Sequence, residues 1–257
     1  MTISGPWLED YGNDLKTSIV FLTRLPLPLP HTTPVNGSDI ARAAWAYPIA
    51  GILVGCIGAA VYAIAHRLGL PAWPAAALAI AATIAVSGCL HEDGLADTAD
   101  GFGGGNTREQ KLDIMRDSRI GVYGVCALAM SILLRTSALA NLDDAAAVAW
   151  ALIAAHGVAR ATLPVFMYLL PPARSDGLSH DVGRPPSQSV AVAGVLGILI
   201  LAICLGVGLG IAALILLIVA IALMAWLSLV QIDGQTGDVL GALEQVSEVV
   251  ILLVALR

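Results

Sequence analysis

Residues 189–230 read SVAVAGVLGILILAICLGVGLGIAALILLIVAIALMAWLSLV and contain no charged side chain. A helix needs about 20 apolar residues to cross the ~30 Å of hydrocarbon in a bilayer. The stretch is therefore too long for one crossing and suits two. Three closely spaced glycines (Gly206, Gly208 and Gly210) mark its middle, where we expect the helix to break.

The composition of the chain extends this prediction to the whole protein. Of the 257 residues, 58% are hydrophobic and only 12% are charged, whereas soluble domains carry about 25% charged residues. Further apolar stretches of membrane-spanning length, and a last helix that contains Glu244 and Glu248, lie at 44–65, 74–90, 120–138, 147–170 and 239–256. The sequence predicts an all-α, polytopic transmembrane helical bundle of about seven spans, forming a single integral-membrane domain over residues 1–257.

The N-terminal segment, residues 1–30, has a different pattern. Residues 7–22 place apolar side chains on one face of a helix and charged or polar side chains on the other. This pattern is typical of a helix that lies in the membrane interface. The sequence TRLPLPLP at 23–30 cannot continue that helix, because its prolines remove backbone donors and favour extended geometry. We expect an interfacial helix that ends before the first span.

The distribution of basic residues predicts the orientation in the membrane. Lys and Arg gather in the N-terminal segment and in the loops 91–119 and 171–188, whereas the turns after the first and third spans are poor in them. Basic loops face the cytoplasm, so these segments and residues 231–247 are expected on the cytoplasmic side of the membrane. The formal net charge of −6 argues against nucleic acid as a partner.

Residues 91–105, HEDGLADTADGFGGG, contain the densest group of acids in the chain. Asp93, Asp97 and Asp100 are spaced i, i+4 and i+7, which stacks three carboxylates on one face if the helix continues past residue 91. Unpaired carboxylates are costly beside lipid, and Mg²⁺ prefers such oxygen ligands together with phosphate oxygens. We predict a Mg²⁺ site, with Gly94 and Gly101 allowing a substrate to approach the backbone.

A second motif, IMRDSRIGVYG at 114–124, places Arg116 and Arg119 just before an apolar span. Arginine forks suit phosphate oxygens, and a helix N-terminus adds its dipole. Ordinary anchoring of a cytoplasmic loop by positive charge is the alternative interpretation.

A third motif, DGQTGDVLGALEQVSE at 233–248, supplies Asp238 and two glutamates after a polar turn. Asp238 could simply cap the last helix. Together the three motifs predict one cytoplasmic pocket with two acidic patches and an arginine patch, which is the arrangement that Mg²⁺-dependent phosphoryl transfer requires.

The chain also resembles the cobalamin synthase (adenosylcobinamide-GDP ribazoletransferase) family through most of its length. The resemblance rests on HEDGLADTADG (91–101) and IMRDSRIGVYG (114–124), which are highly specific as a pair. It continues through FLTRLPLP (21–28), AYPIAGILVG (46–55), GVARA (157–161) and GQTGDVLGA (234–242).

The resemblance implies an inner-membrane enzyme that joins adenosylcobinamide-GDP to α-ribazole, or its 5′-phosphate, and releases GMP with Mg²⁺. On this basis Asp238 is a further metal ligand, His91 is a candidate base or a residue that orients an aspartate, and Arg116 and Arg119 stabilise the diphosphate. Ser118 and Thr236, which lie within the matched motifs, are expected to contact substrate. The sequence leaves open whether Glu92, Glu244 and Glu248 belong to the site, and whether the protein is a homo-oligomer.

Two other functions are compatible with parts of the sequence. A CDP-alcohol-type membrane phosphotransferase also uses clustered aspartates, but its motif requires an arginine that is missing near Asp97. An ion-coupled transporter places its acids near the bilayer midplane, whereas most acids here are expected at cytoplasmic helix ends.

Overall fold

The computed structural model describes residues 6–27, 36–142 and 144–257, and its regular elements there are helices, which confirms the all-α prediction. The helices are α1 (Pro6–Leu22), α2 (Gly37–Ala43), η1 (Ala44–Ala46), α3 (Tyr47–Arg67), α4 (Ala72–Ser87), α5 (Leu90–Gly104), α6 (Arg108–Ile114), α7 (Val122–Ala140), α8 (Ala145–Leu169), α9 (Leu178–Val182), α10 (Ser187–Ile232) and α11 (Gly237–Val254).

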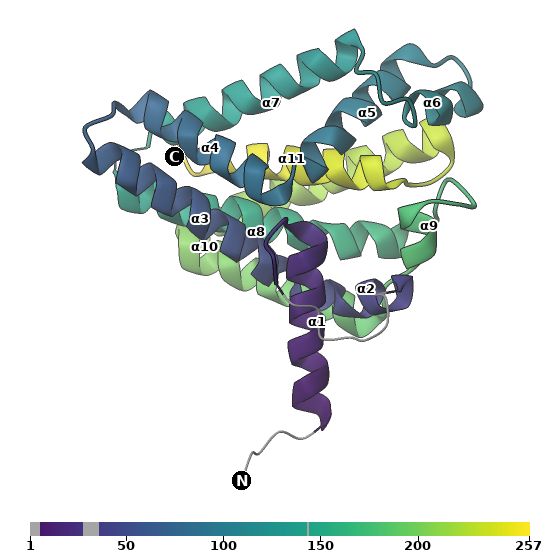
Figure 1. The fold of residues 1–257 in the computed structure, drawn as a ribbon, viewed down its shortest axis with the longest axis horizontal. Coiled ribbons are helices and arrows are strands. Elements are labelled where there is room, and N and C mark those ends of the chain that lie inside the picture. Colours follow the sequence, from purple (N-terminus) through teal and green to yellow (C-terminus); the bar gives the residue numbers. More distant parts are fainter. Residues whose placement is uncertain (1–5, 28–35, 143) are drawn as a thin grey trace.

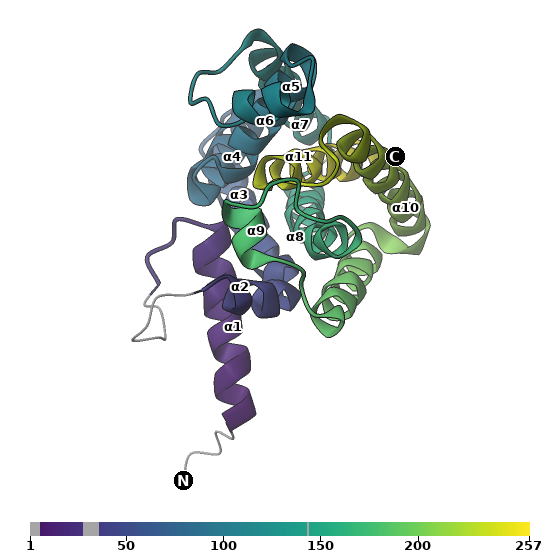
Figure 2. The ribbon, with the colours of Figure 1, turned by 90° about the vertical axis from the view of Figure 1, so that its right-hand side faces the viewer.

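Helix α8 forms the centre of the bundle, with α3, α10 and α11 packed around it (Figures 1 and 2). In its most apolar window 72% of the residues are buried, against 17% for α10. Close approach of α3 depends on glycine, because a Cβ on Gly55 would lie 2.6 Å from the carbonyl oxygen of Leu152, and one on Gly51 would overlap the carbonyl oxygen of His156. Small residues thus let the two backbones touch, as in other membrane helix pairs.

Helix α10 is two helices that meet at Gly206, where the backbone angles φ 75° and ψ 168° are not helical. A Cβ on Gly210 would lie 3.3 Å from the carbonyl carbon of Leu201, so the chain folds back on itself. The predicted break is therefore confirmed. Many large apolar side chains of α10 face outward, including Ile203 and Val207, each 70% exposed, as expected for a surface that contacts lipid.

The chain turns by 90° between α4 and α5. Gly88 and Cys89 both adopt left-handed backbone angles at this corner, with φ of 66° and 59°. The helix of the second span therefore ends at Ser87, and the predicted acids lie on the separate helix α5 (Figure 1).

Within the part of the chain that the structure describes, four helical segments are long and apolar enough to cross a membrane: 37–67, α7, α8 and α10; the bent pair of α4 and α5 would make a fifth. The expected count of about seven is not reached by these criteria. Helix α10 counts once although it is broken, and α11 contains three carboxylates within its 18 residues. Several helices of membrane-spanning length indicate a multi-pass membrane protein.

Helix α1 ends at Leu22, directly before the proline-rich segment, as predicted; residues 28–30 of that segment lie outside the described residues. One polar residue departs from the expected amphipathic pattern. Asp14 is buried, and its carboxylate accepts hydrogen bonds from Arg42 Nε at 3.0 Å and Trp45 Nε1 at 3.1 Å. It ties α1 to the start of the bundle, because a buried carboxylate needs such partners.

Two glycine-to-alanine substitutions test the packing of α3 on α8. Gly51→Ala places a methyl group against the α8 backbone and should lower the free energy of unfolding by about 1–3 kcal/mol. Gly194→Ala is the matched control, since a Cβ there meets nothing within 4 Å, and alanine should stabilise that helix by roughly 0.5–1 kcal/mol. Thermal unfolding in detergent measures both, and equal melting temperatures for the two variants would contradict the packing.

Candidate functional site

Three segments far apart in the sequence meet at one end of the bundle: α5 with α6, the loop after α8, and the turn before α11 (Figure 1). The backbone N–H of Ala173 donates to the Gln235 carbonyl at 2.8 Å, and the N–H of Gln235 donates to the Pro171 carbonyl at 2.9 Å. Arg108 Nε donates to the Ile232 carbonyl at 3.1 Å. The two acidic motifs, at 91–105 and 233–248, therefore lie near each other at this end, because α5 packs on α11.

Asp93, Asp97 and Asp238 form the acidic centre of this end. Asp93 and Asp238 line one cavity, and Asp93 and Asp97 line a second cavity on the other side of α5. Asp97 is partly buried and lies in the electrostatic field of the other two carboxylates. Such a group of like charges needs a cation, and a set of carboxylate oxygens without thiolates suits Mg²⁺.

Arg174 lies beside this centre. From the sequence it was expected only to contribute to the positive charge of the loop 171–188. Its Nη2 lies 3.8 Å from Asp238 Oδ2 and donates to the Leu112 carbonyl at 2.8 Å. Burial lowers the pKa of the guanidinium, and the Asp238 carboxylate acts in the opposite direction. Arginine remains charged under such shifts, so Arg174 supplies one fixed positive charge beside the acids.

Asp100, the third predicted ligand on α5, has both oxygens bonded to the backbone of α7. Oδ2 accepts from the Gly121 N–H at 2.7 Å, and Oδ1 accepts from the Gly124 N–H at 2.9 Å. Asp100 therefore caps the N-terminus of α7, where a negative charge is favourable. Its role as a metal ligand stays a prediction.

The predicted substrate contacts on small residues have packing roles as well. Gly94 meets Gly241 where α5 crosses α11, and it also borders a cavity. Gly101 lies against the Lys111 carbonyl of α6, with no room for a side chain. Thr236 caps α11 by accepting from the Val239 N–H at 3.3 Å.

The two arginines of the motif at 114–124 differ in their surroundings. Arg116 and Ser118 line the same cavity as Asp93 and Asp97. Arg119 is 87% exposed and pairs with Asp117, and its hydrogen bonds lower the pKa of Asp117 to about 2. Arg116 is also paired at the surface, with Asp176, so the two arginines differ in that Arg116 borders the cavity of the acids as well.

A buried ionic network lies behind the acidic centre, and sequence reasoning did not foresee it. Charged residues within apolar spans were the available signal, since such groups occur in membranes mainly when paired. The network combines residues of α5, α7, α8 and α11: His91, Glu92, Arg135, His156, Arg160, Glu244, Gln245 and Glu248.

Each arginine of the network bridges two glutamates. Arg135 Nη1 lies 2.9 Å from Glu248 Oε2, and its Nη2 lies 3.2 Å from Glu92 Oε1. Arg160 Nη1 lies 2.6 Å from Glu244 Oε1 and 3.4 Å from Glu248 Oε1. The sequence left open where Glu92, Glu244 and Glu248 lie relative to the site. All three face arginines in the interior.

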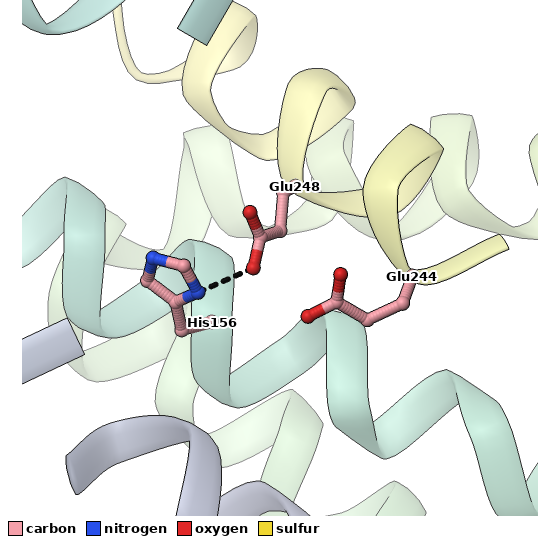
Figure 3. A group of neighbouring side chains, drawn as sticks. All are labelled: His156, Glu244 and Glu248. Atoms are coloured by element: carbon pink, nitrogen blue, oxygen red, sulfur yellow. Dashed lines mark ion pairs between the residues drawn. The ribbon is translucent and has the colours of Figure 1, made fainter. Parts of the chain in front are cut away.

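One part of the network has the composition of a metal site. Ligand atoms of His156, Glu244 and Glu248 lie within 4.8 Å of one another, and His156 Nδ1 is paired with Glu248 (Figure 3). Arg160 and Arg135, however, already contact these carboxylates. Because the guanidinium groups supply the neutralising charge, Asp93, Asp97 and Asp238 fit Mg²⁺ better than this group does.

His91 connects the network to the acidic centre. Its Nδ1 lies 3.4 Å from Arg160 Nη2 and 3.6 Å from Glu244 Oε1. Its Nε2 is buried and has no hydrogen-bond partner among the described residues, although His91 lines the same cavity as Asp93 and Asp238. A ring nitrogen oriented in this way is available to a bound molecule.

Fold and site together define a multi-pass helical membrane protein with a carboxylate-rich polar site at one end of its bundle. The chain belongs to the cobalamin-5-phosphate synthase family, whose sequence profile matches residues 14–256. The resemblance inferred from the motifs is thereby confirmed.

Curated relatives support the same assignment. A protein from Bradyrhizobium diazoefficiens is 56% identical over 242 residues, covering 94% of this chain and 92% of the relative. One from Mesorhizobium japonicum is 54% identical over 243 residues, covering 95% and 92%. Both are named adenosylcobinamide-GDP ribazoletransferase. No solved structure gives a significant match.

A double-mutant cycle tests the buried network. Arg135→Met leaves Glu92 and Glu248 without their common partner, and breaking a buried pair should cost about 3–5 kcal/mol of unfolding free energy. Arg135→Met combined with Glu92→Met removes one of the two orphaned charges and should recover part of that loss. Urea unfolding in mild detergent measures the cycle, and strictly additive effects would rule out the pairing.

Proposed function

We propose that this chain transfers the phosphate group that carries adenosylcobinamide from its diphosphate linkage with GMP to the ribose of α-ribazole, or of its 5′-phosphate. GMP is released. Family membership and the names of the relatives support the reaction. The location of the site rests on one observation: Asp93 on α5 borders one cavity together with Asp238 on α11 and a second cavity together with Asp97.

Asp93, Asp97 and Asp238 are the residues that would hold Mg²⁺, with Asp100 as a further predicted ligand. Bound there, Mg²⁺ would neutralise diphosphate oxygens and make the phosphorus easier to attack. The chain contributes carboxylates from two helices fixed by their own packing, so the phosphate-binding geometry is set before substrate arrives.

The chemical step is an in-line displacement at the phosphorus that carries the cobinamide arm. The ribazole hydroxyl oxygen forms a new P–O bond, the bond from that phosphorus to the bridging oxygen of the diphosphate breaks, and GMP leaves with the bridging oxygen. The hydroxyl proton must be removed, and His91 Nε2 is the candidate acceptor because it is unpaired and belongs to a residue that borders the cavity.

Arginines complete the proposed site by binding phosphate oxygens. Arg116 lines the cavity of Asp93 and Asp97, and Arg174 lies beside Asp238. Both have the planar fork that grips two oxygens of one phosphate. Arg119 is predicted to share this role; it pairs with Asp117 at the surface, and its part in phosphate binding stays a prediction.

In the membrane, the proposed arrangement has about seven spans with the site facing the cytoplasm of the inner membrane. The two halves of α10, 187–205 and 207–232, each have about the length needed to cross. Helix α11 can accompany them because Glu244 and Glu248 face arginines rather than lipid. The proposed substrates, adenosylcobinamide-GDP and α-ribazole, would then enter from the cytoplasmic side.

Asp97→Asn tests the metal site. The change keeps side-chain volume but removes a charge, so GMP release at fixed Mg²⁺ should fall at least ~100-fold, which corresponds to about 2.7 kcal/mol. Asp10→Asn, on the exposed part of α1, is the control and should retain activity. Near-normal turnover of well-folded Asp97→Asn protein would exclude a ligand role for this carboxylate.

Single cysteines in a background without native cysteines test the orientation. Asn106 and Asn141 are both exposed; Asn106 lies in the loop between α5 and α6, and Asn141 directly follows α7. With a membrane-impermeant thiol reagent on intact cells, Asn141→Cys should label and Asn106→Cys should label only after permeabilisation. The reverse pattern would place the acidic site outside the cytoplasm.

A further inference from the structure

A cavity extends from the acidic centre to the packed start of the bundle. At one side it is bordered by His91, Asp93, Arg174 and Asp238. An apolar part of its wall comes from α1, α3, α8 and α11: Phe21, Leu22, Tyr47, Leu163, Met167 and Leu240. Polar residues of the loop after α8, of α9 and of the turn before α11 line another part: Asp176, Ser179, His180, Gln235 and Thr236. The rings of Phe21 and Tyr47 stack with centroids 6.0 Å apart and form an aromatic part of this wall.

Three buried polar atoms on lining residues have no hydrogen-bond partner among the described residues. They are the Tyr47 hydroxyl, His91 Nε2 and Arg174 Nε. Buried polar groups are nearly always paired in folded proteins, and an exception needs an explanation. Because the three residues come from α3, α5 and the loop after α8 yet border one cavity, a ligand in that cavity is the simplest explanation.

The apolar wall limits the chemistry of this ligand. Tyr47 carries the one side-chain hydroxyl of the apolar part of the wall, which otherwise consists of hydrocarbon and aromatic surface. A guanine base carries several donors and acceptors, and most of them would lose their partners against such a wall. A flat, uncharged base with a single acceptor nitrogen leaves nothing unpaired, because the Tyr47 hydroxyl can donate to it.

We propose that this cavity is the binding site of the acceptor nucleoside, and that Tyr47 determines specificity for a benzimidazole-type base. The base of α-ribazole has this chemistry: it is planar, dimethylated and largely apolar, with one ring nitrogen free to accept a hydrogen bond. The inference rests on the proposed function, and it divides the two substrates between the two sides of α5. The nucleoside lies on the side of Asp93 and Asp238, and the diphosphate reaches the carboxylates from the side of Asp97 and Arg116.

This division also gives the unpaired His91 Nε2 a partner. With the base against the apolar wall, the sugar lies toward the polar side of the cavity, where His91 and Asp93 are found. The nucleophilic hydroxyl then meets the candidate base and the metal-binding carboxylates together. Asp93 borders both cavities, so it is the point at which the two substrates would meet.

The test combines a substitution in the protein with a substitution in the substrate. Tyr47→Phe removes only the hydroxyl, and Tyr62→Phe is the matched control, a buried tyrosine on the same helix that does not line the cavity. Each protein is assayed for GMP release with α-ribazole and with an indole analogue, in which carbon replaces the acceptor nitrogen. Binding of both nucleosides to each detergent-solubilised protein is also measured by calorimetry, without the second substrate.

We expect Tyr47→Phe to raise KM for α-ribazole about 10-fold, with KM for adenosylcobinamide-GDP unchanged. The wild type and Tyr62→Phe should bind the indole analogue about 10-fold more weakly than α-ribazole, whereas Tyr47→Phe should not distinguish them. A variant that still distinguishes the two nucleosides would overturn the assignment of Tyr47. A rise confined to KM for adenosylcobinamide-GDP would show that guanine occupies the cavity instead.

The calorimetric arm separates this inference from the proposed reaction. Nucleoside binding that depends on Tyr47, without GMP release by the wild type, would refute the proposed reaction and leave the cavity assignment standing. Normal GMP release with no effect of Tyr47→Phe on nucleoside binding would refute the cavity assignment and leave the proposed reaction standing.

Discussion

The organisation of this protein depends on how charge is neutralised inside an apolar bundle. Arg135 on α7 and Arg160 on α8 hold three glutamates that come from α5 and α11. None of these charges is tolerable alone in a membrane interior, so each helix is stable in place only when the others are present. The network fixes the relative positions of four helices, and two of them, α5 and α11, carry the aspartates of the candidate site.

The division of labour along α5 follows from this arrangement. Glu92 is buried and pairs with Arg135, although it also borders the cavity of Asp93 and Asp97, while the next residue, Asp93, is exposed and borders both cavities. Seven residues further along, Asp100 is bonded to the first turn of α7. Neighbouring acids of one short helix thus have different surroundings, and the paired acids fix the position of the aspartates proposed to hold Mg²⁺.

Much of this fold could be predicted from the sequence, because periodicity and length report directly on membrane helices. The break at Gly206 and the end of α1 at Leu22 were predicted for physical reasons that the structure bears out. The corner at Gly88 and Cys89 was missed, since only glycine there signals a left-handed backbone and Cys89 gives no such sign. The pairing of Arg135 with Glu92 was also missed, because charge spacing along one helix does not reveal its partner on another.

The convergence of the aspartates was predictable from composition and loop charge, whereas the role of Arg174 beside them was not. A loop arginine looks the same in sequence whether it anchors a helix or contacts Asp238. The unpaired Tyr47 hydroxyl was equally hidden, because a tyrosine at the start of an apolar helix is ordinary interfacial chemistry. Such features depend on which segments the tertiary fold brings together.

The shortness of α4 has a consequence for the surrounding lipid. Its 16 residues rise about 24 Å, less than the ~30 Å thickness of bilayer hydrocarbon. Hydrophobic mismatch of this kind is relieved by local thinning of the bilayer. Thinning beside the 90° corner would bring headgroups and water down to α5, so that its aspartates meet an aqueous surface without leaving the bundle. Bilayer thickness thereby becomes one of the variables that govern access to the acidic end of the protein.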